Sequence, residues 1–293
     1  PTRDKVTEID LHGHIVIVDG SNLFHIMDSL TSIPYLPGQS VTSSVNGVSY
    51  SGMFAWDIKL ADADSISHWD TRNVTDMSYM FADANAFNQL VSNFDTSKVT
   101  NMSGMFDHAF AFNQPVSNFD TSKVTNMNSM FASAEAFNQS VSNFDTRNVT
   151  DMSWMLSADS FNQSVSNFDT SKVTDMSYMF SAESFNQSVS NFDTRNVTDM
   201  TCMFIGAQKF NQPVPFNTSR VESMAGMFDG TQAFNQPLSN FDTSNVTDMS
   251  DMFNGTQAFN QPISNLDTSK VTDMNNMFAS TESFNQPVSN FDT

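Results

Sequence analysis

The sequence predicts an α/β solenoid of stacked repeats, each 24 or 25 residues long, with a very short parallel strand and one short helix. Three observations predict this fold: a tripeptide that recurs at one period, apolar residues at helix spacing in each copy, and an Asp-Thr turn in nearly every copy. Units this short cannot bury an apolar face alone. They must therefore stack and share one core.

The period is set by the tripeptide Phe-Asn-Gln, which occurs nine times and always lies four residues before a Val, Leu or Ile. Its Phe residues are Phe87, Phe112, Phe137, Phe161, Phe185, Phe210, Phe234, Phe259 and Phe284. Residues 51–293 are thus expected to form about nine to ten repeats, the last of them incomplete. Residues 1–50 do not follow the pattern and are expected to form an N-terminal cap, with a strand from Ile15 to Val18.

The unit at residues 112–136 illustrates the expected elements in order. The short strand is expected around Val116 to Phe119, ahead of an Asp-Thr-Ser turn. The helix is expected from the next apolar residues, which lie three, six and seven positions after Val124. Thr125 stands at the N-cap position of this helix, and in most other copies an Asp follows the equivalent Thr. Met fills most core positions of the predicted helix, so we expect these Met residues to pack in the core.

Two irregularities interrupt the repeat. One residue is missing between Leu156 and Phe161 and again between Phe180 and Phe185, which predicts a surface loop, because a loop absorbs a deletion without shifting the core. The other lies at Pro215, where the copy is one residue short in the strand segment and a local defect is expected.

Composition excludes several classes of function. A net charge of −20 opposes binding to nucleic acid and to anionic membrane surfaces, and no apolar stretch is long enough to span a bilayer. Cys202 is the single cysteine, so no intramolecular disulfide is expected. The five His residues form no motif typical of catalysis, and we expect no enzyme activity.

The repeats resemble the BspA-like leucine-rich repeats of bacterial and protist surface proteins. One copy of the signature consists of Phe87-Asn88-Gln89, Phe94-Asp95-Thr96-Ser97 and Val99-Thr100-Asn101-Met102-Ser103-Gly104-Met105-Phe106. The resemblance covers about three quarters of the chain. It implies a right-handed leucine-rich-repeat solenoid, a cell-surface or secreted location, and a role in adhesion or protein recognition without catalytic residues.

Because the repeats stack, the equivalent polar residues of successive repeats form a column. The invariant Asn of Phe-Asn-Gln is expected to satisfy backbone groups of neighbouring turns. The Asp column comprises Asp70, Asp95, Asp120, Asp145, Asp169, Asp193, Asp242, Asp267 and Asp292. We expect these carboxylates to cap their own turns, with Ca²⁺ binding as the alternative for Asp95, Asp120, Asp145, Asp169 and Asp193. Paired Thr residues, such as Thr121 and Thr125, leave ice binding as another alternative.

The candidate ligand surface is the exposed side of the short strands. If Val116 points inward, the residue after it points outward, and its equivalents form a polar row. That row comprises Ser92, Ser117, Ser142, Ser166, Ser190, Pro215, Ser239, Ser264 and Ser289. We predict a monomeric piece of a larger surface protein that binds a protein or glycan through this row by weak multivalent contacts, with no required cofactor. The alternative is a structural spacer within a large adhesin.

Overall fold

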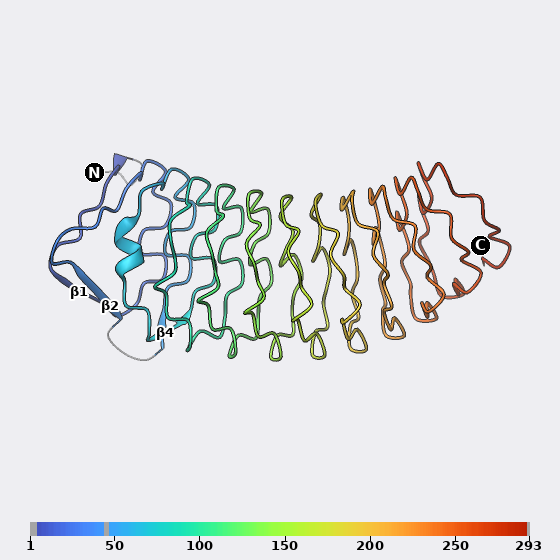
Figure 1. The fold of residues 1–293 in the computed structure, drawn as a ribbon, viewed down its shortest axis with the longest axis horizontal. Coiled ribbons are helices and arrows are strands. Elements are labelled where there is room, and N and C mark those ends of the chain that lie inside the picture. Colours follow the sequence, from blue (N-terminus) through green and yellow to red (C-terminus); the bar gives the residue numbers. More distant parts are fainter. Residues whose placement is uncertain (1–4, 44–46, 292–293) are drawn as a thin grey trace. The chain divides into compact units, whose positions relative to one another are not determined.

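A computed structural model describes residues 5–43 and 47–291. The chain divides into two compact units, Pro1–Asn148 and Val149–Thr293. Within each unit, consecutive repeats lie side by side as stacked turns of the chain (Figure 1). Among the described residues no helix is long and apolar enough to cross a membrane.

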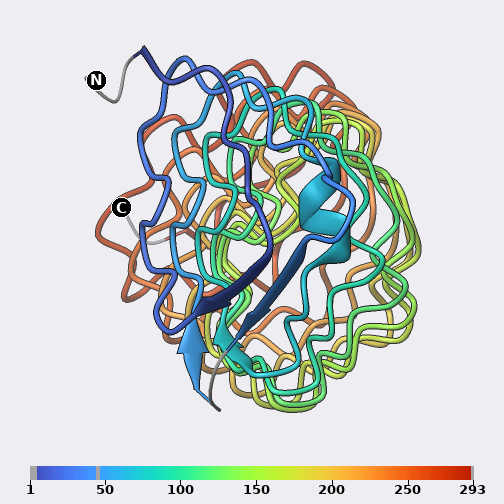
Figure 2. The same ribbon diagram turned by 90° about the vertical axis from the view of Figure 1, so that its left-hand side faces the viewer.

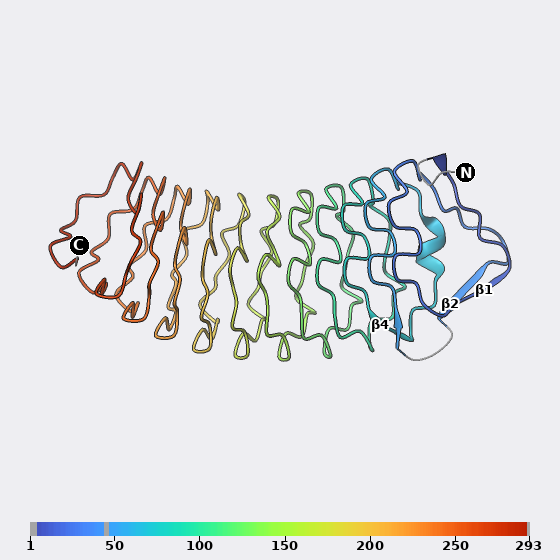
Figure 3. The same cartoon turned by 180° about the vertical axis from the view of Figure 1, so that it is seen from behind.

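The first unit holds all the regular elements that the described residues form. These are the strands β1 (His14–Ile17), β2 (Ser40–Ser43), β3 (Val48–Ser49) and β4 (Val74–Asp76), and the 3-10 helix η2 (Asp64–His68). β1 pairs in parallel with β2 (Figure 2 and Figure 3), and β3 pairs in parallel with β4. β1 confirms the strand expected near residue 15. The cap boundary at residue 50 stays a prediction, and residues 1–4 and 44–46 of that cap lie outside the described residues.

Backbone hydrogen bonds join each turn to the next. In the first unit, the N–H groups of Met77, Tyr79, Phe81 and Asp83 donate to carbonyls of the next turn, each on the residue just before the equivalent position, at 3.1, 2.8, 2.9 and 2.7 Å. Residues 20–26 contribute a further turn of this kind, since Gly20 N–H donates to Ser49 O at 2.9 Å. The second unit repeats the pattern from Met200 to Gly206. The chain is therefore a repeat-type fold with few short parallel strands.

The predicted helix in each repeat is wrong. The residue before the second Met of every Met-x-x-Met segment has a positive φ, for example Tyr79 at 54°, Ser129 at 55° and Trp154 at 59°. A left-handed residue cannot continue a right-handed helix. The segment instead forms successive tight turns, in which Met80 N–H donates to Met77 O at 3.3 Å. Apolar residues spaced by three arise from these turns just as they would from a helix.

The predicted strand at residues 116–119 is also wrong. Phe119 N–H donates to Val116 O at 3.1 Å, which closes a tight turn. The side chains of Val116 and Phe119 are both buried. In a strand, residues three positions apart would point to opposite faces. Parallel pairing occurs instead ahead of the Met segment, where Asn126 bridges to Asn101.

Columns of Phe rings form the core of each unit. In the first unit, the ring centroids of Phe81, Phe106 and Phe131 follow one another at 5.6 and 5.5 Å. In most repeats the Phe of Phe-Asn-Gln stacks on this column within its own turn, as Phe112 does on Phe106 at 3.9 Å, whereas Phe161 follows Leu156. In the second unit, Phe228 stacks on Phe253 at 5.7 Å. Nearly all the Met residues of the repeats are buried against these rings, which confirms their predicted core role.

The missing residue of the two short repeats has a conformational cause. Repeats of full length contain a second left-handed residue two positions after the core Phe, as at Asp83 and Ser133. In the two short repeats, Trp154 and Tyr178 hold the first left-handed position, but no described residue two positions after Leu156 or Phe180 has a positive φ. In the first short repeat this segment is an irregular turn that is only partly at the surface, since Asp159 and Ser160 are exposed whereas Ala158 is buried. The deletion removes one turn residue and keeps both flanking core residues in place.

Candidate functional site

The predicted ligand row, here called the Ser/Pro row, is exposed at all nine positions. Its members are Ser92, Ser117, Ser142, Ser166, Ser190, Pro215, Ser239, Ser264 and Ser289. The apolar residue before each member is buried in every repeat except the last described one, where Val288 is exposed. Exposure of the row follows from a tight turn rather than from a strand.

The two central residues of that turn have different roles. Ser117 and Asn118 lie between buried Val116 and buried Phe119. The side-chain amide of Asn118 donates to Val91 O at 3.2 Å and to Phe94 O at 3.1 Å, both in the preceding repeat. Asn143, Asn240 and Asn265 make equivalent bonds. Asn therefore holds adjacent turns together, whereas Ser117 faces solvent.

Some Ser hydroxyls of the row bond locally. The Ser140 hydroxyl donates to Ser142 Oγ at 3.0 Å, and Ser164 donates to Ser166 Oγ at the same distance. No hydrogen bond shown for the described residues links one member of the Ser/Pro row to the member in the next repeat. The row therefore presents polar groups that the stacking of repeats does not use.

Pro215 breaks this row inside the second unit. Phe216 N–H donates to Val214 O at 2.8 Å, so the turn is shortened by one residue and the bridging Asn is lost. A hollow of about 370 Å³ lies beside it, lined in part by Pro215, Asn217 and Asp242. The sequence indicated a defect here but not a hollow.

The Asp column caps its own turns. Asp95 Oδ1 accepts the Ser97 N–H at 3.0 Å, and Asp120 Oδ1 accepts the Ser122 N–H at 3.0 Å. Hydrogen bonds from the Ser97 side chain and backbone lower the pKa of the Asp95 carboxyl, which outweighs repulsion from Asp70 and Asp120. These bonds confirm the expected capping role. Asp292 lies outside the described residues.

Arg replaces Ser in some of these turns. Arg147 donates through Nε to Asp145 Oδ1 at 2.9 Å and through Nη2 to Asp145 Oδ2 at 2.6 Å, and Asp193 is bound in the same way by Arg195. Asp169 caps Ser171 at 3.0 Å. The five carboxylates considered for Ca²⁺ are thus each engaged within their own turn. Among the described residues no group of three or more His, Cys, Asp or Glu side chains could hold a metal ion.

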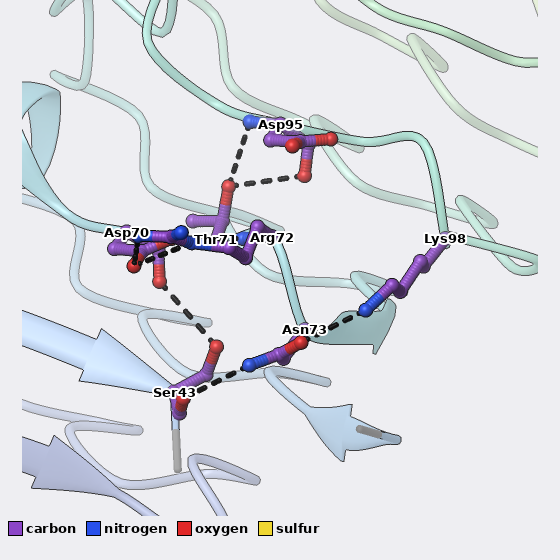
Figure 4. A network of polar contacts seen from close by, with 7 residues as sticks. All are labelled: Ser43, Asp70, Thr71, Arg72, Asn73, Asp95 and Lys98. Atoms are coloured by element: carbon purple, nitrogen blue, oxygen red, sulfur yellow. Dashed lines mark hydrogen bonds and ion pairs between the residues drawn. The ribbon is translucent and has the colours of Figure 1, made fainter. Parts of the chain in front are cut away.

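A polar network connects these turns from one repeat to the next (Figure 4). The Thr71 hydroxyl donates to Asp95 O at 3.1 Å and accepts the Asp95 N–H at 2.8 Å. Lys98 Nζ donates to Asn73 Oδ1 at 2.9 Å, and the Asn73 amide donates to Ser43 O at 3.2 Å. Lys98 therefore joins two repeats, whereas Arg72 bonds to Asp70 within its own turn.

Only one column of the paired Thr array considered for ice binding lies on the surface. The Thr after each Asp, such as Thr121, is buried and bonds to the next turn. Only the second Thr of the pair, such as Thr125, is exposed. A flat surface with two Thr columns is therefore not present among the described residues.

The Asn of Phe-Asn-Gln has the structural role that we predicted. Asn88 Oδ1 accepts the Asn113 N–H at 2.9 Å and the Gln114 amide at 3.0 Å. The same bonds join Asn211 to Asn235 and Gln236 in the second unit. The Asn column therefore holds adjacent repeats together.

Comparison with known families gives one match. The family model described as "Mycoplasma protein of unknown function, DUF285" matches residues 48–159, 139–215 and 214–293. Together these stretches cover residues 48–293 of the 293-residue chain. No curated protein and no solved structure matches the chain.

Proposed function

This chain belongs to the family described as "Mycoplasma protein of unknown function, DUF285", and we propose that it is a non-enzymatic recognition or adhesion module. In this proposal the protein lies at the cell surface or is secreted, and it binds a protein or glycan through the Ser/Pro row. Tandem matches to one family support its repeat character. We further propose that the repeats form a right-handed, BspA-like leucine-rich-repeat solenoid.

The observation that carries the proposal is the contrast between polar columns. The invariant Asn, the Asn after each Ser, and the Thr after each Asp all bond from repeat to repeat. The Ser/Pro row is equally regular, yet the bonds shown for its described members are local. A repeated polar surface that stacking does not require is suited to many weak contacts with a repetitive partner.

A structural spacer is the second candidate, because the same stacking would serve to hold another domain at a distance. The two are separated by a binding screen of the purified chain against immobilised glycans and immobilised extracellular proteins. Saturable binding to a defined surface supports recognition. Failure to bind any surface in the screen, while a neighbouring domain of the same protein does bind, supports the spacer.

We also propose that the fold needs no cofactor, since the Asp carboxylates cap their turns. The melting temperature is then expected to be the same in EDTA and in millimolar Ca²⁺. A clear rise in melting temperature with Ca²⁺, reversed by the chelator, would show that the Asp column binds the cation.

A further inference from the structure

A hollow of about 370 Å³ lies on the first unit, away from the Ser/Pro row. Its walls include Trp56, Tyr79, Asp83 and Asp107, and Gly52 is among the residues that line it. The volume is within the range of small-ligand sites. The hollow combines exposed aromatic rings with half-buried carboxylates.

The repeat geometry explains why space exists here. Gly52 and Tyr79 occupy the first left-handed position of consecutive turns. A Cβ on Gly52 would lie 2.5 Å from Asn22 Oδ1, so a side chain at this position would intrude on the hollow. Tyr79 leans instead towards Gly104, where an added Cβ would lie 2.3 Å from its ring. Glycine at two alternate turns thus leaves room around the Tyr79 ring.

Two aromatic rings are available to a ligand. Trp56 is 51% exposed and Tyr79 is 43% exposed. Trp56 occupies the second left-handed position, which Asp83 holds in the next turn. Aromatic faces attract cations through the ring quadrupole, and Trp does so most strongly.

Two carboxylates complete the hollow. Asp107 takes the place that buried Ala82 and Ala132 hold in the neighbouring turns, and it is half-buried. Its Oδ1 lies 2.7 Å from His108 Nδ1. No hydrogen-bond donor is shown for the Asp83 carboxylate among the described residues. Burial raises the pKa of both carboxyls and outweighs the opposite effect of His108.

We propose that this hollow binds a primary ammonium group on an aliphatic stem, such as a Lys side chain of a partner protein. The rings of Trp56 and Tyr79 contact the stem and the cation, and the carboxylates of Asp83 and Asp107 accept its N–H groups. An ammonium with N–H donors fits better than a quaternary one, since a carboxylate accepts hydrogen bonds from N–H groups. The site is independent of the Ser/Pro row, so either can fail without the other.

The probe is Nα-acetyl-lysine amide, and the readout is quenching of Trp56 fluorescence in a Trp154→Phe background, which leaves only buried Trp69 besides Trp56. We expect saturable quenching, at least tenfold weaker binding of the trimethylated analogue, and no saturation with the Nε-acetylated one. Equal response to the neutral Nε-acetylated probe would overturn the proposal.

The negative charge of the whole chain requires a matched control. Asp83→Asn is expected to raise the dissociation constant at least tenfold. Asp64→Asn, which makes the same charge change at an exposed position outside the hollow, is expected to alter it less than twofold. Equal weakening by the two variants would show non-specific attraction and overturn the proposal. Trp56→Leu, followed by NMR shifts of the Tyr79 ring, gives a second test: unchanged affinity would contradict the role of the aromatic wall.

Discussion

Two hydrogen bonds join Thr96 to the backbone of Asp120 in the next repeat. The Thr96 hydroxyl accepts the Asp120 N–H at 2.8 Å and donates to Asp120 O at 3.0 Å. Thr96 is only 1% exposed, and both bonds are partly buried. The same pair of bonds joins Thr121 to Asp145. A single hydroxyl thus satisfies a donor and an acceptor of the adjacent turn.

Thr96→Val is therefore expected to lower the free energy of unfolding by about 1–3 kcal/mol, because Val keeps the shape but leaves both backbone groups unpaired. Urea unfolding followed by circular dichroism measures the change. Thr100→Val is the control, since Thr100 is exposed and its hydroxyl makes one bond, to Thr75 O at 3.2 Å. An equal decrease in the free energy of unfolding for the two variants would contradict a larger contribution from the Thr96 hydroxyl.

Asp57 gives the fold a dependence on pH. The carboxyl is fully buried, and its Oδ1 accepts the Met27 N–H at 2.6 Å, whereas Oδ2 has no partner among the described residues. Burial raises the pKa of Asp57 from 3.8 to about 8. Between these values the folded chain holds more protons than the unfolded one, so the contribution of this group to stability falls as pH rises from 4 to 8.

Asp57→Asn is expected to remove this contribution while keeping an acceptor for Met27. The melting temperature of the variant relative to the parent should therefore increase steadily from pH 5 to pH 8. Thermal unfolding in matched buffers measures this difference, which cancels the opposite trend of the capping Asp residues. A difference that stays constant with pH would show that Asp57 does not titrate in this range.

The second left-handed position should tolerate deletion, whereas the first should not. Removing Ser133 leaves Phe-Ala-Ala-Glu-Ala-Phe, which matches the natural short form Phe180-Ser181-Ala182-Glu183-Ser184-Phe185. We expect this deletion to cost about 1 kcal/mol or less. Removing Ser129 shifts buried Met130 and Phe131 out of register, and should cost more than about 4 kcal/mol. Similar unfolding midpoints for the two deletions would contradict this assignment.

Sequence alone located the core but not the backbone that carries it. The buried positions of Val124, Met127, Met130 and Phe131 follow directly from the repeat. The helix was wrong because a spacing of three suits tight turns as well as a helix, and the discriminating feature is the positive φ at Ser129. The sequence gives little indication of this left-handed conformation, because the residue type at the position varies and includes Gly, Tyr, Trp and Asn.

The candidate surfaces were predictable to different degrees. Exposure of the Ser/Pro row follows from the burial of each preceding apolar residue, which is periodic in the sequence. The hollow at Trp56 could not be predicted, because it depends on single departures from the repeat at Gly52, Trp56 and Asp107. The sequence does not show that these residues, which lie in different repeats, line one hollow; this follows only from the stacking of the turns.

Recognition through the Ser/Pro row is tested most directly by surface plasmon resonance on each glycan or extracellular protein that binds saturably in the screen. The test variant is Ser92→Arg with Ser117→Arg, and the control places the same charges on the exposed Thr column, as Thr100→Arg with Thr125→Arg. The account predicts that the Ser variant raises the dissociation constant at least tenfold and that the Thr variant changes it less than twofold. Equal dissociation constants for the two variants would contradict it.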